Sequence, residues 1–485
     1  MLGRRRSSSI SSIDTPYHAL PQTPDLAQEI NIPSAIEEAE LASEDMEEDT
    51  IDDGPTPSDA PVDGRIHWIH FMLGAAVLLP WNVMITAEPY FISQLRRSSI
   101  RSTFGSYLAT TFTLSNFLFL AHATITSKKV PPAERTRWSM LCLAFLIGLL
   151  TLSTFIDLPE GIFITFVIST GIALAGAGAY LQTSVIAVAS LFGPSIIQSL
   201  LSGQAIVAVI LASSALLMGT AETKSARLFF GISTSFLLVC GTANVWMTRL
   251  PSYRAVVPAE PRRRRTLSIS ADFLLPAPDG SDTRVSDSKA TWDQILSIAQ
   301  RNIIYELAVA YVFIITLSVF PAITISIVPT NPSIHPLFFS SLHFLVFNTG
   351  DWFGRYLCSI PKLLIWSAKN LLGLSLARTL FIPLFLACNL QRDASSPSAL
   401  PVISSDLLYM VLLFAFGLSN GYISSMCLMS APSLEHNPRL MGRKEDVDLA
   451  APIASFCIVG GLVIGSVLSF IVRAIVCGCN PFLTA

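Results

Sequence analysis

The sequence predicts an all-α polytopic membrane protein with eleven transmembrane helices, six in a first half and five in a second. Three observations predict this fold class. Of the 485 residues, 51% are hydrophobic and 13% are charged, and the mean hydropathy of +0.56 is too high for a soluble protein of this length. Eleven apolar stretches are long enough to cross a bilayer. A long polar interruption divides these stretches six plus five.

The predicted spans are runs of roughly twenty or more mainly apolar residues. They lie at about 67–91, 105–126, 138–157, 162–190, 196–220, 227–248, 303–328, 335–360, 370–390, 405–431 and 449–475. The first span contains Pro80, Trp81 and Asn82, where a simple anchor would carry aliphatic side chains. Proline frees a backbone carbonyl, and hydrocarbon cannot satisfy the amide of Asn82. We therefore expect this helix to face protein or a water-filled cavity.

Soluble segments precede and divide the membrane region. Residues 1–64 are acidic, rich in Ser and Pro and poor in aromatics, which predicts a disordered cytoplasmic tail. Residues 65–248 form the first membrane half, 249–301 a basic cytoplasmic loop, and 302–485 the second half. Basic-Ser strings at 4–8 and 264–268 are candidate sites for kinases acting on the tail and the loop, although such strings are more often plain solvated sequence.

The distribution of basic residues predicts the orientation in the membrane. With a cytoplasmic N-terminus, 22 of the 31 Lys and Arg residues lie on the cytoplasmic side and 6 on the opposite side. Arg96, Arg97 and Arg101 run against this bias and are outnumbered. The odd span count then puts the C-terminus on the extracellular or lumenal side. The sequence leaves a plasma membrane and a vacuolar or lysosomal membrane both open.

The eight cysteines predict neither a disulfide framework nor a metal site, since six lie in or beside apolar spans without paired spacing. Only Cys477 and Cys479 are placed to be paired or modified. No phosphate-binding glycine loop occurs, and no nucleophile, base and orienting group converge in the spans. We expect no cofactor, no nucleic-acid partner and no enzymatic activity.

A polar stripe in the eighth span is the main functional signal. Phe344, Asn348, Asp351 and Arg355 are spaced i, i+4, i+7 and i+11, which places them within about 60° on one helix face. Charges at membrane depth cost several kcal/mol each unless they pair or meet water, so the stripe should face the bundle interior. It is either a binding surface or an Asp351–Arg355 pair that only locks neighbouring helices.

The fourth span repeats this spacing with Gly171, Ala175, Gly178 and Gln182. Three small residues favour close helix packing. The amide of Gln182 can both donate to and accept from the edge of a heterocycle, so it is a candidate binding group.

An apolar and aromatic face occurs in the first span. Leu78, Trp81 and Ile85 stand at i, i+3 and i+7, where they can cover a planar ring or pack against lipid or another helix.

Several ordered motifs extend beyond these faces. Leu78-Leu-Pro-Trp-Asn82 is followed by Tyr90-Phe91, and Leu181-Gln182 by Ser202-Gly203-Gln204. The second half carries Phe347-Asn348-x-x-Asp351-x-x-Gly354-Arg355, the run 378–389, and Gly417-Leu-Ser-Asn-Gly-Tyr422 before Ala431-Pro432. This series closely resembles the equilibrative nucleoside transporter family. The resemblance covers about 400 residues and leaves out the tail and the central loop.

The resemblance implies a major-facilitator-like bundle that carries nucleosides by facilitated diffusion and alternating access, and it leaves open whether nucleobases are carried as well. It implies substrate contacts at the positions of Leu78, Trp81, Gln182, Asn348, Asp351 and Arg355. It gives Pro80, Asn82, Gly354, Arg378 and Asn420 as further motif positions, and nucleosides and the lipid bilayer as partners.

Two alternatives stay open. A proton-coupled carrier of nucleosides or another polar solute would need a titrating group, for which Asp351, Glu88 and Glu306 are candidates. The cation of Arg355 one turn from Asp351 argues mildly against a proton relay there. A non-transporting receptor or scaffold would explain the soluble segments but not the buried polar stripes.

Overall fold

The computed structural model describes residues 63–95, 98, 100–101, 103–218, 222–257, 280–321, 323–331, 333–390 and 402–477. Regular structure in these ranges is helical, apart from isolated β-bridges that pair Ile327 with Leu390 and Cys388 with Ile403. The predicted acidic tail, up to residue 62, and the arginine run 262–265 lie outside the described residues.

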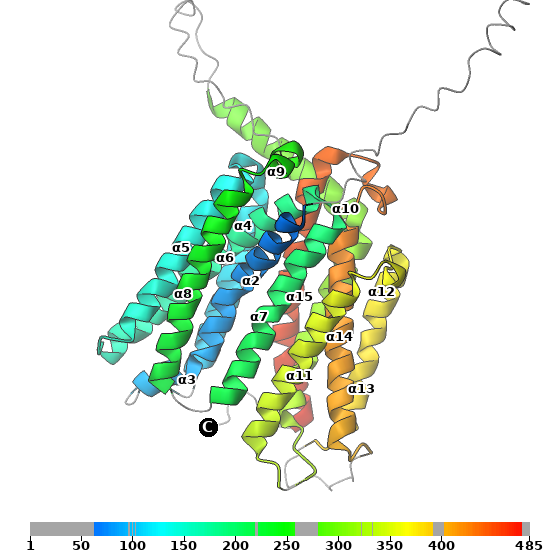
Figure 1. The fold of residues 1–485 in the computed structure, drawn as a ribbon. Coiled ribbons are helices and arrows are strands. Elements are labelled where there is room, and N and C mark those ends of the chain that lie inside the picture. Colours follow the sequence, from blue (N-terminus) through cyan, green and yellow to red (C-terminus); the bar gives the residue numbers. More distant parts are fainter. Residues whose placement is uncertain are drawn as a thin grey trace, which may run out of the picture. The chain divides into compact units, whose positions relative to one another are not determined.

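Helices of the first half follow one another through short connections (Figure 1). They are α2 (Gly64–Thr86), α3 (Glu88–Gln94), α4 (Phe104–Ile125), the 3-10 helix η1 (Ser127–Lys129), α5 (Pro132–Ser153), α6 (Glu160–Leu191), α7 (Pro194–Met218), α8 (Glu222–Met247) and α9 (Pro251–Val256).

The second half begins with a 40-residue helix, α10 (Gly280–Val319). After it come η2 (Thr324–Ser326), α11 (Pro336–Leu357), η3 (Pro361–Leu363), α12 (Ala368–Ala377), η4 (Arg378–Leu380), α13 (Phe381–Leu386), α14 (Asp406–Ser430), η5 (Pro438–Leu440), η6 (Lys444–Asp446) and α15 (Val447–Cys477).

Ten segments of the described chain are long and apolar enough to cross a membrane, with Ala368–Leu386 counted as one. The prediction of an all-α polytopic membrane protein is therefore confirmed. The count of eleven is not, because α11, the predicted eighth span, is not among the ten. Its length is sufficient, but His343, Asn348, Asp351 and Arg355 lower its hydropathy. Whether α11 spans the bilayer stays a prediction.

Two predicted span ends were wrong. The first span ends at Thr86 rather than at 91, because Pro89 in the first turn of α3 cannot continue the hydrogen bonding of α2. The seventh ends at Val319 rather than at 328, two residues before Pro321. Its helix also begins at Gly280, inside the predicted central loop, which additionally contains α9. The division into tail, two membrane halves and basic loop stays a prediction.

Helices α11 and α14 pack closely through glycine. A methyl group on Gly354 would lie 2.1 Å from the carbonyl oxygen of Leu418, and one on Gly421 would lie 1.9 Å from that of Asp351. Only glycine therefore fits at these positions, and the two backbones touch directly. This contact fixes where the polar stripe of α11 lies along the axis of α14.

The two halves meet through helices α7 and α15. Helix α7 of the first half packs against α11 and α14, and α15 of the second half packs against α4 and α6. The largest buried apolar cluster includes residues of both halves, such as Leu174 and Leu200 with Val309 and Met426. The polar stripe of α11 thus lies at an interface between the halves.

Candidate functional site

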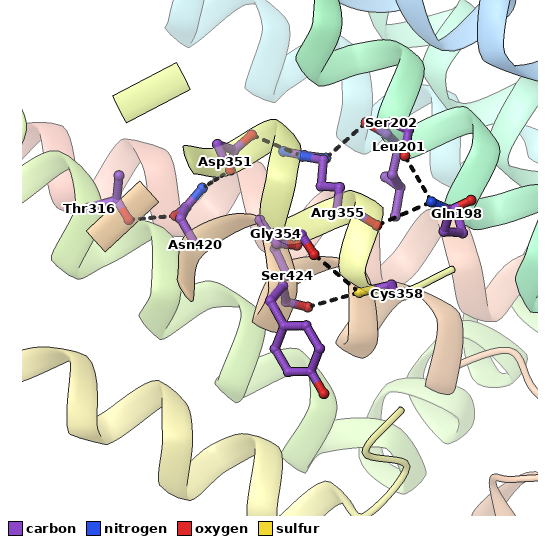
Figure 2. Close-up of polar contacts among 12 residues, drawn as sticks. Gln198, Leu201, Ser202, Thr316, Asp351, Gly354, Arg355, Cys358, Asn420 and Ser424 are labelled. Atoms are coloured by element: carbon purple, nitrogen blue, oxygen red, sulfur yellow. Dashed lines mark hydrogen bonds and ion pairs between the residues drawn. The ribbon is translucent and has the colours of Figure 1, made fainter. Parts of the chain in front are cut away.

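A buried ion pair on α11 is the centre of the site. Arg355 Nε donates to Asp351 Oδ2 over 2.9 Å, and both residues are 8% exposed. Asn420 of α14 donates to the other carboxylate oxygen over 2.6 Å. Figure 2 shows Asp351 between these two partners. Both oxygens of the carboxylate are therefore satisfied, as a buried charge requires.

The hydrogen bonding continues from Asn420 into α10 and η4. Thr316 donates to Asn420 Oδ1 over 2.7 Å and accepts from Arg378 Nη2 over 2.9 Å. Arg378 is 1% exposed, also donates to the carbonyl oxygen of Phe416 and the hydroxyl of Ser419, and lies over the ring of Phe416. A second buried cation thus connects to Asp351 through two neutral side chains.

Arg355 also connects the second half to α7 of the first. Its Nη1 donates to the carbonyl oxygen of Leu201 over 3.4 Å. In the other direction, Gln198 Nε2 donates to the backbone oxygen of Arg355 over 3.1 Å and to Ser202 over 3.0 Å (Figure 2). The ion pair therefore lies where the halves meet, and its Arg355 joins α11 to α7 by hydrogen bonds.

The other two members of the predicted stripe are half-buried. Asn348 donates its amide to the carbonyl oxygen of Phe344, within the same helix, over 2.8 Å. Phe344 packs edge-on against Phe320, with 5.2 Å between the ring centroids. The acceptor oxygen of the Asn348 side chain is not used in this bond.

The residues of the apolar and aromatic face predicted on α2 differ in their burial. Trp81 is half-buried against Phe112 of α4, with ring centroids 4.8 Å apart, and Leu78 is also half-buried. Ile85 is 45% exposed. Asn82 donates to the carbonyl oxygen of Leu78, so its amide is satisfied inside its own helix. Pro80 lies within α2, which continues past it.

Gln182 of α6 reaches across to the second half. Its Nε2 donates to the hydroxyl of Ser455 on α15 over 2.6 Å. Among the described residues, Trp81, Gln182 and Asp351 make no hydrogen bond or ring contact with one another. The structure thus brings Asp351 and Arg355 together, while Trp81 and Gln182 have separate partners on other helices.

Hydrogen bonds between the halves gather toward one end of the bundle, which we call the Lys128 end. There, Lys128 of η1 donates to Gln294 of α10 over 3.0 Å. Ser190 near the end of α6 donates to the backbone oxygen of Val447 at the start of α15 over 3.2 Å. The contacts of Gln198 with α11 lie near the same end, since they involve the start of α7 and the end of α11. The halves are therefore joined here.

Sequence reasoning missed three partners in this site, Thr316, Gln198 and Ser455. Each is a polar side chain in an apolar span, and spacing within one helix cannot show which residue it meets on another. Within the described ranges, no group of three His, Cys, Asp or Glu residues is placed to hold a metal ion.

Comparison with known proteins identifies the family. The family model described as nucleoside transporter matches residues 168–474, more than half of the chain. This chain belongs to the nucleoside transporter family.

The chain is similar to human equilibrative nucleoside transporter 1, with 26% identity over 455 residues that cover 84% of this chain and 96% of the relative. It is similar to mouse equilibrative nucleoside transporter 2, with 28% identity over 459 residues and the same coverage. Among solved structures it is similar to a major facilitator superfamily proton:xylose symporter, with 10% identity, 85% and 88% coverage and a TM-score of 0.49. The family resemblance found in the motifs is confirmed.

Proposed function

We propose that this transporter carries nucleosides across a membrane by facilitated diffusion, exposing a central site to either side in turn. Its family membership and its similarity to equilibrative nucleoside transporters support this function. The observation that carries the site assignment is the buried Asp351–Arg355 pair, bonded to α14 on one side and to α7 of the other half on the other. A ligand bound there would contact both halves. On this proposal the protein is a carrier and not an enzyme.

Ribose recognition follows from the charges of the pair. An ionised Asp351 can accept from a ribose hydroxyl, and Arg355 can donate to one. In the structure these groups use Asn420 and the carbonyl oxygen of Leu201 as partners. A ribose would replace partners of the same donor and acceptor type, so the exchange need not leave a buried charge unpaired.

Base recognition is assigned to side chains on the three helices α6, α2 and α11. Gln182 would read the edge of the base, and Trp81 and Phe344 would cover its faces. Leu78 and the exposed Ile85 would complete the apolar wall. The remaining member of the proposed site, Asn348, would accept from a hydroxyl or a base N–H through its side-chain oxygen.

The orientation belongs to the same proposal. The excess of basic residues places the N-terminus and the Lys128 end in the cytoplasm, and the C-terminus on the extracellular or lumenal side. In the arrangement described here, the hydrogen bonds of Lys128, Ser190 and Gln198 would then hold the cytoplasmic side together.

Uptake into proteoliposomes tests the function. The purified full-length chain should equilibrate radiolabelled uridine or adenosine across the bilayer, and unlabelled nucleoside loaded inside should accelerate entry by exchange. Protein-free vesicles and vesicles given radiolabelled xylose control for leakage and for general sugar transport. Folded protein that moves neither nucleoside would overturn the proposal.

A further inference from the structure

A second buried carboxylate lies away from the proposed site, on α10. Glu306 is 4% exposed, and its Oε1 has no hydrogen-bond partner among the described residues. Asp351, in contrast, has a partner for each oxygen. An ionised carboxylate that is buried without a counter-charge is far more costly than a neutral carboxyl group. Glu306 is therefore suited to hold a proton in this arrangement of the helices.

Among the described residues, Glu306 forms no ion pair. Helices α4, α12, α14 and α15 and the elements η4 and η5 pack against α10. The titratable or charged side chains that these elements carry include Cys457 on α15, Cys427 on α14, Arg439 on η5, Arg378 on η4, Lys369 on α12 and His122 on α4. Of these, Arg378 donates to Thr316, Lys369 is exposed and His122 is bonded to Tyr180.

Glu306 lies on α10 about 18 Å along the helix from Gln294, which accepts from Lys128. One helical turn, or about 6 Å, nearer the Lys128 end, Asn302 donates to the carbonyl oxygen of Ala431 and accepts from Asn437. Both partners belong to the connection between α14 and α15. Buried amide hydrogen bonds therefore lie between Glu306 and the Lys128 end.

Helix α4 of the first half covers this region. It packs against both α10 and α15, and Phe117 of α4 stacks on Phe456, the neighbour of Cys457, with ring centroids 5.1 Å apart. If the halves separate at the Lys128 end, as alternating access requires, α4 moves away from α10 and α15. Water then gains access to Glu306 from that side.

We propose that Glu306 is a proton-binding site, which holds a proton while the halves are joined at the Lys128 end and releases it to water when that end opens. The O–H bond of the carboxyl group breaks, the proton passes to water or buffer, and the carboxylate stays on the protein. The joined arrangement binds one more proton than the open one, so a rise in pH at that side favours opening. Because the proton enters and leaves on the same side, it modulates the carrier without driving accumulation.

Comparison of Glu306→Gln with the native chain tests the site. The transport measurement in this comparison depends on the proposed function, because it follows uridine. Equilibrium exchange of radiolabelled uridine is measured in proteoliposomes with equal pH on both sides, from about 5.5 to 8.5. The native rate should change by several fold, with a limit of about tenfold per pH unit for one linked proton. Gln has the shape of the neutral carboxyl and should make the profile flat. Glu306→Asp should keep the dependence.

A matched control and a second measurement complete the test. Glu134→Gln removes an exposed carboxylate of α5 and should leave the native pH profile unchanged. The thermal unfolding midpoint in detergent should fall with rising pH in the native chain relative to Glu306→Gln, whether or not the protein transports uridine. A flat native profile, or the same pH dependence in Glu306→Gln, overturns the site. Absence of exchange at every pH overturns the proposed function instead, and the unfolding curves still decide on Glu306.

Discussion

Replacement of Asp351 by Asn separates the two interpretations of the ion pair. The native carboxylate accepts from Arg355 over 2.9 Å and from Asn420 over 2.6 Å. Asn keeps one acceptor oxygen, so at least one of these bonds is lost, and Arg355 loses its counter-charge while buried. A charge-assisted hydrogen bond contributes about 1.5–3 kcal/mol, so we expect uridine affinity to fall about ten- to a hundredfold. Stability should fall as well.

Loss of uptake alone does not distinguish a binding residue from one that only locks helices, so the assay compares substrates. If Asp351 accepts from ribose hydroxyls, the native carrier should discriminate against 2′,3′-dideoxyuridine by a factor of about ten or more. The folded Asp351→Asn protein should transport uridine and the dideoxy analogue about equally. Cys358→Ser, one residue beyond the end of α11, is the control, and it should keep both uptake and discrimination. Unchanged discrimination in folded Asp351→Asn would refute the binding role and leave the pair as a helix lock.

The remaining predictions concern topology, packing, base recognition and energetics. Single cysteines at 268 and 396, in a background without other reactive thiols, should react with an impermeant maleimide from opposite sides; labelling from one side contradicts the predicted orientation. Gly421→Ala places a methyl 1.9 Å from the Asp351 carbonyl oxygen, so the unfolding midpoint should drop, with an overpacking cost of about 1–3 kcal/mol. Ser455→Ala removes the acceptor of the Gln182 amide. It should change the ratio of adenosine to uridine uptake while expression and the unfolding midpoint stay near those of the native chain. A pH gradient without a nucleoside gradient should cause no accumulation of uridine; protonophore-sensitive accumulation would show a coupled carrier.

The sequence by itself determined the class of protein, the approximate spans and the Asp351–Arg355 face. Each of these depends on patterns within one segment: apolar runs of bilayer length, and a helical repeat that places residues seven and four apart on one face. The family could also be recognised, because its motifs are short and local. The errors in the helix ends at Thr86 and Val319 came from runs that remain apolar past the helix end, where proline rather than hydropathy stops the helix.

Only the tertiary structure decided which side chains meet across helices. The sequence does not show that Asn420 and Thr316 connect Asp351 to Arg378, or that Gln198 joins α7 to α11. It also does not show that Oε1 of Glu306 is buried with no hydrogen-bond partner among the described residues. A polar residue in an apolar span has the same helical periodicity whether it is paired or not. Its energy depends on the neighbouring helix, whose height and rotation are set by packing such as the glycine contacts between α11 and α14.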